Sequence, residues 1–106
     1  MELKIGDLDE LMSKSVQCIS VDGQKYVLIY HQQTLYALDD ACPHKFASLS
    51  SGHLRGDKIV CPWHGAEFKI TTGDCFSPLA PKGLKSYPIT VRNNSVFIKL
   101  EDSENR

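Results

Sequence analysis

The sequence predicts an all-β fold: one small antiparallel β-sandwich or barrel with a lobe inserted into it. Two residue pairs suited to tight hairpins, Asp22-Gly23 and Asn93-Asn94, each join two segments rich in β-branched and aromatic residues. Between these hairpins, residues 41–51 show no polar and apolar alternation. A chain of 106 residues has room for one hydrophobic core. We therefore expect a single domain over residues 1–106, with the inserted lobe at about 40–82.

The first part of the chain is expected to form a strand, a short helical turn and a three-stranded meander. Residues 1–12 mix apolar and acidic side chains in a pattern that fits an edge strand followed by one helical turn. Residues 15–21 and 25–31 are β-rich, and the turn between them contains glycine. Residues 34–38 continue the meander. His31, at the end of its strand, is expected to be a solvated loop residue.

The second part should contain four further strands. Residues 58–61 and 67–70 flank a short loop, and the second of them is followed by a turn at Thr72-Gly73. Residues 85–92 and 95–100 are expected to form the last two strands, with a polar tail after them. His53 lies between Gly52 and Leu54, and we expect it at the surface.

Composition excludes several classes of function. The formal net charge is −1, with 42% apolar and 24% charged residues, which does not fit a nucleic-acid-binding protein, a disordered chain or a membrane binder. No apolar run approaches the ~20 residues that cross a bilayer, and the N-terminus lacks the profile of a signal peptide. The sequence therefore predicts a cytoplasmic protein.

Two short stretches with metal-binding side chains dominate the sequence. Cys42-Pro43-His44 is followed after sixteen residues by Cys61-Pro62-Trp63-His64. Two thiolates and two imidazoles can hold one tetrahedral zinc ion, or an iron-sulfur cluster with thiolates on one iron and imidazoles on the other. Zinc sites of this composition usually pair Cys with Cys and His with His, whereas each stretch here mixes the two types. The mixed order favours the cluster, and zinc remains the alternative.

These stretches resemble the ligand motifs of the Rieske family, Cys-x-His and Cys-x2-His. The resemblance implies a single 2Fe-2S cluster, with Cys42 and Cys61 on the inner iron and His44 and His64 on the outer iron. Two thiolates and two neutral imidazoles leave the oxidised cluster formally neutral, so it accepts an electron more readily than a cluster with four thiolates. Residues 77–81, with two prolines, resemble the loop that covers the cluster in this family.

The chain departs from the respiratory and photosynthetic members of that family. Those proteins have one more Cys in each ligand loop, joined as a disulfide, and Ala47 and Trp63 stand at the matching positions here. They also have Ser and Tyr hydroxyls that donate hydrogen bonds to the cluster sulfurs. Ala66 and Phe68 at those positions cannot donate, which should lower the reduction potential.

The resemblance thus implies a soluble, low-potential Rieske-type ferredoxin. Such a protein is not itself an enzyme: it transfers single electrons from a flavoprotein reductase to a terminal oxygenase of the aromatic-ring dioxygenase type. We expect a monomer that meets both partners transiently. Two alternatives remain: the small Rieske-like subunit of a reductase such as nitrite reductase, and a zinc-binding or metal-free module.

Two cysteines lie outside the ligand motifs. Cys18 lies in a β-rich run, and we expect it to be an ordinary buried thiol. Cys75 follows the Thr72-Gly73 turn and is expected to be a small edge residue. No export signal accompanies them, so neither is expected to form a disulfide.

Overall fold

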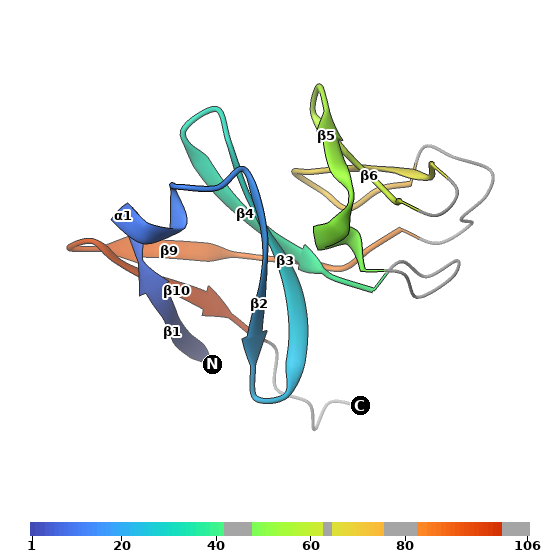
Figure 1. The fold of residues 1–106 in the computed structure, drawn as a ribbon. Coiled ribbons are helices and arrows are strands. Elements are labelled where there is room, and N and C mark those ends of the chain that lie inside the picture. Colours follow the sequence, from blue (N-terminus) through green and yellow to red (C-terminus); the bar gives the residue numbers. More distant parts are fainter. Residues whose placement is uncertain (42–47, 63–64, 76–82, 101–106) are drawn as a thin grey trace.

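Three antiparallel sheets make up the computed structural model, which describes residues 1–41, 48–62, 65–75 and 83–100 (Figure 1). The first sheet has the order β1 (Glu2–Asp7), β10 (Ser95–Lys99) and β9 (Ile89–Arg92). The second has the order β2 (Val16–Val21), β3 (Gln24–His31), β4 (Thr34–Asp39) and β8 (Ser86–Tyr87). The third has the order β5 (His53–Arg55), β6 (Lys58–Val60) and β7 (Glu67–Lys69).

Helical structure is minor in the described part of the chain. α1 (Leu8–Leu11) follows β1, and the 3-10 helix η1 (Leu49–Ser51) precedes β5. Within these ranges no helix is long and apolar enough to cross a membrane. The all-β, antiparallel fold class is therefore confirmed, as is the edge strand followed by one helical turn at the start of the chain.

Both expected hairpins are present. Asp22 and Gly23 have φ values of 52° and 81°, and Asn93 and Asn94 have 50° and 69°. Positive φ at both central positions matches the right-handed twist of the flanking strands, so these residues fix the register of β2 with β3 and of β9 with β10. A third two-residue turn, Gln32-Gln33, has φ values of 50° and 66° and joins β3 to β4. The Gln-Gln pair does not predict a tight hairpin turn, because Gln does not favour positive φ.

The strand expected over residues 85–92 is divided in two, which corrects that prediction. β8 pairs with β4 in the second sheet, whereas β9 pairs with β10 in the first. Pro88 separates them, and because proline has no N–H it cannot donate to either ladder. The chain therefore passes from one sheet to the other at Pro88.

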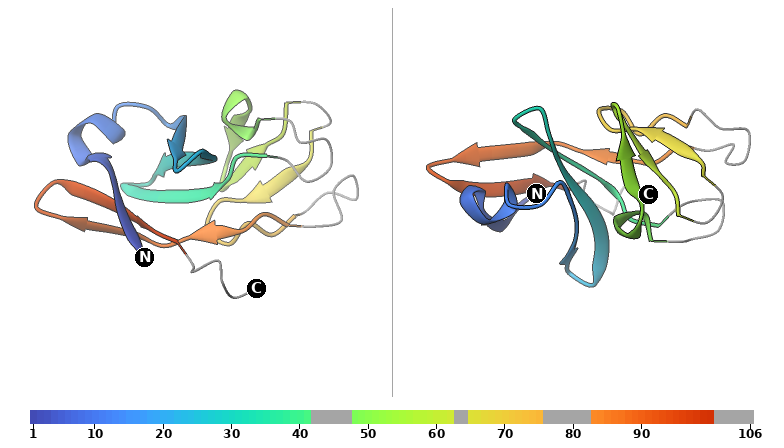
Figure 2. Two further views of the ribbon diagram at one scale, coloured as in Figure 1. Left: turned by 90° about the horizontal axis from the view of Figure 1, so that it is seen from below. Right: turned by 45° about the horizontal axis from the view of Figure 1, so that its top comes forward.

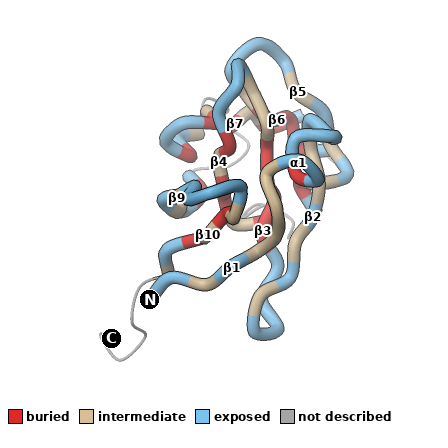
Figure 3. The backbone as a smooth tube through the Cα atoms, turned by 90° about the vertical axis from the view of Figure 1, so that its left-hand side faces the viewer, coloured by how far each residue is buried: buried red, intermediate tan, exposed pale blue. Residues whose placement is uncertain are grey.

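β3 is buried on both faces and separates two core clusters. Val27 and Ile29 belong to the first core cluster, with residues of β4, β6 and β7. Tyr26 and Leu28 belong to the second core cluster, with residues of α1, β4 and β10. Figure 3 shows buried stretches along β3, β4, β6 and β10. The third sheet thus packs against one face of β3 and the first sheet against the other.

Cys18 is exposed, which contradicts the expectation of a buried thiol. It lies opposite Val27 in the register of β2 and β3, and side chains of opposed residues share a face of the sheet. That face is fully covered at Val27 but not at Cys18, because β2 is the outer strand of its sheet. Cys75 is partly buried against the first core cluster, as expected of a small edge residue. His53 is exposed on β5, also as expected.

Candidate metal centre

Of the four predicted ligands, Cys61 lies within the described residues, whereas Cys42, His44 and His64 lie outside them. Among the described residues no group of three or more His, Cys, Asp or Glu side chains could hold a metal ion. The structure does describe the position of Cys61 and the residues that flank the other three predicted ligands.

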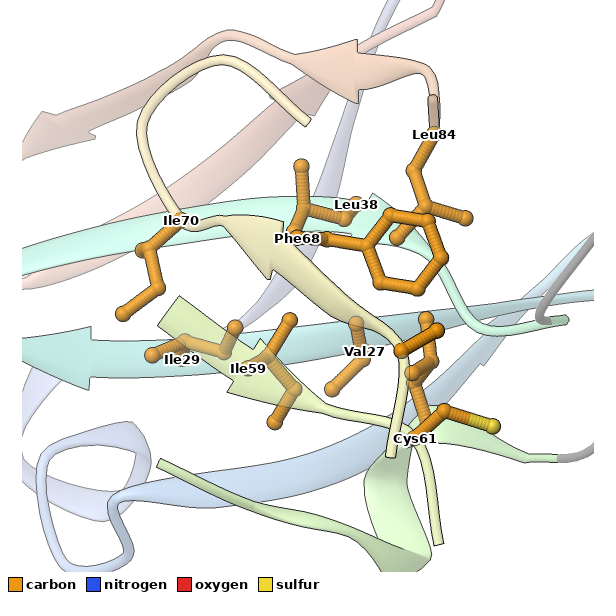
Figure 4. Close-up of a cluster of buried hydrophobic side chains, with 10 residues drawn as sticks. Val27, Ile29, Leu38, Ile59, Cys61, Phe68, Ile70 and Leu84 are labelled. Carbon is orange, nitrogen blue, oxygen red and sulfur yellow. The ribbon is translucent and has the colours of Figure 1, made fainter. Parts of the chain in front are cut away.

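Cys61 directly follows β6 and is 2% exposed. Its N–H donates to the carbonyl of Ala66 at 2.8 Å, and its own carbonyl accepts from the N–H of Gly65 at 3.1 Å. Gly65 has a φ of 72°, a value that few other residues adopt without strain. These bonds hold the chain just after β6 against the chain just before β7. Figure 4 shows the Cys61 sulfur at the end of the first core cluster opposite Ile29 and Ile70.

The surroundings of Cys61 are apolar. Ala66 and Phe68 are fully buried and belong to the same cluster as Cys61. Among the described residues no side chain donates a hydrogen bond to the Cys61 sulfur. A lone thiolate would be costly in such surroundings, whereas a thiolate bound to iron has its charge neutralised by the metal. The site therefore fits the inner, protein-covered side of a cluster.

The segment 42–47, which holds Cys42 and His44, begins and ends at residues that are held together. Ala41 and Ser48 form an isolated antiparallel bridge, and Leu49 N–H donates to the carbonyl of Asp40 at 2.7 Å. Leu49 is fully buried in the same core cluster as Cys61. Both segments with predicted ligands are therefore adjoined by residues of one core cluster.

Asp40, which the sequence interpretation did not single out, provides a further tie at this point. Its carboxylate accepts from the hydroxyl of Ser48 at 2.6 Å and from the N–H of Ser50 at 2.8 Å.

The preceding Asp39 accepts from the Tyr87 hydroxyl at 2.6 Å, and Tyr87 packs edge-on against Tyr26 with ring centroids 4.9 Å apart. Burial, followed by the charge of Asp39, raises the pKa of Tyr26. In the sequence, the two acidic residues Asp39 and Asp40 just before Cys42 were the signal that could have predicted these contacts.

The predicted proline loop, residues 77–81, lies outside the described residues, but its two ends are fixed. Phe68 and Cys75 form an isolated bridge, and Leu84 N–H donates to the Gly73 carbonyl at 2.7 Å. Gly73 has a φ of 83°, and a Cβ there would overlap the carbonyl oxygen of Leu84. Glycine is therefore needed at Gly73 for two reasons, the positive φ and the close approach of the two chains.

The ends of all three segments gather at one end of the molecule. In Figure 1 the chain leaves and re-enters the described residues on the right-hand side, next to the third sheet, and both views in Figure 2 agree. The described residues that flank the two Cys and His motifs therefore lie at the same end of the molecule.

An antiparallel β framework together with two Cys and His motifs in the sequence is the combination expected of a small iron-sulfur domain. The chain belongs to the Rieske family, because the family model for the Rieske [2Fe-2S] domain matches residues 1–88. Its cofactor is accordingly one Rieske-type 2Fe-2S cluster.

Similar proteins include ferredoxins of oxygenase systems. The chain is 33% identical over 94 residues to the ferredoxin component of the naphthalene 1,2-dioxygenase/salicylate 5-hydroxylase systems of a Ralstonia species, covering 89% of this chain and 90% of that protein. A solved complex of reduced oxygenase and oxidised ferredoxin in carbazole 1,9a-dioxygenase has a chain that matches with a TM-score of 0.83 and 30% identity, covering 94% and 97% of the two chains.

A structure described as a putative nitrite reductase small subunit also matches, with a TM-score of 0.78 and 24% identity over 94% of this chain and 99% of that one. At that identity the likeness shows a shared fold only.

Proposed function

We propose that this protein is a ferredoxin that transfers single electrons from a flavoprotein reductase to an oxygenase of the aromatic-ring dioxygenase type. The supporting observation is the match to a dioxygenase-system ferredoxin component over 89% of this chain and 90% of that relative. A likeness along nearly the whole of both chains is more specific than a shared ligand motif, which many proteins of different function contain.

Cys42, His44, Cys61 and His64 are the proposed cluster ligands. Cys61 would bind the inner iron with Cys42, and its burial in an apolar cluster supports that role. His44 and His64 would bind the outer iron. The bound cluster supplies reversible one-electron chemistry. The chain's own contribution is a dry, hydroxyl-free surround at Ala66 and Phe68, which favours a low potential.

The proposed architecture is one domain over residues 1–106, with the ligand segments in a lobe over about 40–82. As an electron carrier it would not catalyse a reaction itself. It would be a cytoplasmic monomer with short-lived complexes, because an electron carrier must release its reductase before it meets its oxygenase. The carbazole dioxygenase complex, in which a similar ferredoxin is bound to its oxygenase, supports the oxygenase as one partner.

The test has two parts. EPR of the dithionite-reduced protein should give the g values of mixed Cys and His ligation, and the protein should be coloured, since zinc has no visible absorption. Anaerobic mixing with an oxidised aromatic-ring oxygenase should then reoxidise the protein within one turnover. A colourless protein that binds zinc after reconstitution with iron and sulfide would contradict the cluster. A reduced cluster that transfers no electron to the oxygenase, but copurifies with a reductase, would favour a subunit role.

A further inference from the structure

β2 forms one edge of the second sheet, and no described strand pairs with its outer side. The two-residue turn that joins β2 to β3 makes the residues on either side of it a hydrogen-bonded pair, and hydrogen-bonded and non-bonded pairs alternate from there along the ladder. The bond from Tyr30 N–H to the Ser15 carbonyl at 2.9 Å fits this alternation. The N–H and C=O groups of Val16, Cys18 and Ser20 therefore point away from β3.

This edge lacks the features that prevent an edge strand from pairing with another chain, which are charged side chains, prolines, bulges and short length. The other edge strands described have them. β1 has three charged side chains and a register shift, β9 follows Pro88 and ends in an arginine, and β5, β7 and β8 have three residues or fewer. β2 has six residues, an unbroken register and neither a charged side chain nor a proline. It is exposed or partly exposed along its whole length (Figure 3).

We propose that β2 is a self-association surface, on which a second copy of the chain adds its own β2 in antiparallel order. The two copies are then related by a twofold axis, and each presents the same strand to the other. Most outward-facing residues are paired when Cys18 lies opposite the partner's Cys18, because Val16 then lies opposite the partner's Ser20. A shift by two residues in either direction loses one of these pairs.

The charged residues on either side of β2 agree with this register. Lys14 is four residues before Cys18, and Asp22 is four residues after it. Antiparallel pairing about Cys18 therefore places Lys14 opposite the partner's Asp22 and Asp22 opposite the partner's Lys14. No described residue forms an ion pair with either side chain within one chain. The second copy is thus complementary in charge as well as in hydrogen bonding.

The pairing should be weak and reversible. Each hydrogen-bonded pair exchanges two bonds, about six in all, and the two ion pairs are exposed. One strand pair buries less than the roughly 1,200 Å² at which stable interfaces begin. The carrier should therefore be a monomer when dilute and should associate as its concentration rises. β2 contains none of the predicted cluster ligands, so this pairing is independent of the proposed electron transfer.

Sedimentation velocity of the cluster-loaded protein at increasing concentration tests whether the pair forms. Lys14→Glu should weaken the association about tenfold, because two attractive contacts become repulsive, and Asp22→Lys should weaken it similarly. The double variant restores opposite charges across the axis and should recover the association. A protein that stays monomeric to about 1 mM overturns the proposal, whatever else β2 binds. Failure of the double variant to recover, at a melting temperature equal to that of Asp22→Lys, overturns the register.

The exposed thiol of Cys18 reports the same register independently. Opposed residues of a strand pair have Cβ atoms about 4.5–5.5 Å apart, so anaerobic glutathione disulfide should join Cys18 to the partner's Cys18 and be reduced to glutathione. The matched control combines Cys18→Ser with Ser20→Cys, which moves the thiol two residues along the same exposed face. The two thiols are then about 13 Å apart, too far for a disulfide. Cross-linking of the natural chain alone supports the proposal, and equal cross-linking of both proteins, or of neither, overturns it.

Discussion

Phe68→Tyr tests whether the side chain of residue 68 faces the cluster. Phe68 is fully buried in the same core cluster as Cys61, and the substitution adds one hydroxyl to its ring. A buried hydroxyl without a partner costs about 1–3 kcal/mol. A cluster sulfur would accept a hydrogen bond from this hydroxyl. The negative charge on the sulfur increases when the cluster is reduced. We therefore expect the hydroxyl to stabilise the reduced state more than the oxidised state.

The magnitude follows from the strengths of the two bonds. A hydrogen bond to a charged group is worth about 1.5–3 kcal/mol and a neutral one about 0.5–1.5 kcal/mol, so the reduced state gains about 1 kcal/mol more. At about 59 mV for each tenfold change in a one-electron equilibrium, the midpoint should rise by about 40 mV. Spectroelectrochemical titration of the loaded protein measures this directly.

A matched control places a hydroxyl in the other core. Val96→Thr replaces a buried methyl group of the second core cluster by a hydroxyl of similar size, so it should reduce thermal stability without changing the midpoint. Ala66→Ser should behave like Phe68→Tyr, because Ala66 is also fully buried beside Cys61. If neither Ala66→Ser nor Phe68→Tyr raises the midpoint, these positions do not face the cluster sulfurs and the argument for a low potential fails.

Two further substitutions test the ligand set and the framework. His64→Ala should abolish or severely weaken cluster assembly, as measured by iron content and visible absorption, whereas His53→Ala, on the exposed face of β5, should load normally; equal iron in both proteins would show that His64 is not a ligand. Gly52→Ala should cost about 3 kcal/mol in denaturant unfolding, because its Cβ would overlap the Val60 carbonyl oxygen. Gly23→Ala, with open space around it and a φ of 81°, should cost about 1 kcal/mol, and equal losses would contradict the steric argument.

The parts of the fold that sequence predicts are those in which a residue's own conformational preference decides the outcome. Asp22-Gly23 and Asn93-Asn94 adopt the positive φ that their chemistry favours, so the two hairpins were predictable. Gln32-Gln33 adopts the same geometry because the pairing of β3 with β4 imposes it. The exchange of sheets at Pro88 also depends on which strand lies nearby, although the proline itself indicates a break.

Two features depend on tertiary structure: how far Cys18 is exposed, and which groups the Asp40 carboxylate contacts. A β-rich run indicates which residues share a face but not how far the opposite layer extends over that face. For Asp40, the sequence shows an acid before a predicted ligand, and only the fold brings Ser48 and Ser50 to its two oxygens. The Cys and His motifs predict the kind of cofactor because metal coordination depends on donor type and spacing. They do not show which core the predicted ligand segments adjoin. The burial of Cys61 and Leu49 in the first core cluster does show it.

The residues that flank segments 42–47, 63–64 and 76–82 are paired with each other. The pairs are the Ala41–Ser48 bridge, the Cys61–Ala66 backbone hydrogen bond and the Gly73–Leu84 backbone hydrogen bond. Residues between such joints can be exchanged or lengthened without pulling the strands out of register. We expect residues 42–47 to tolerate exchange for those of another family member without loss of the strand register, because Ala41 and Ser48 stay joined.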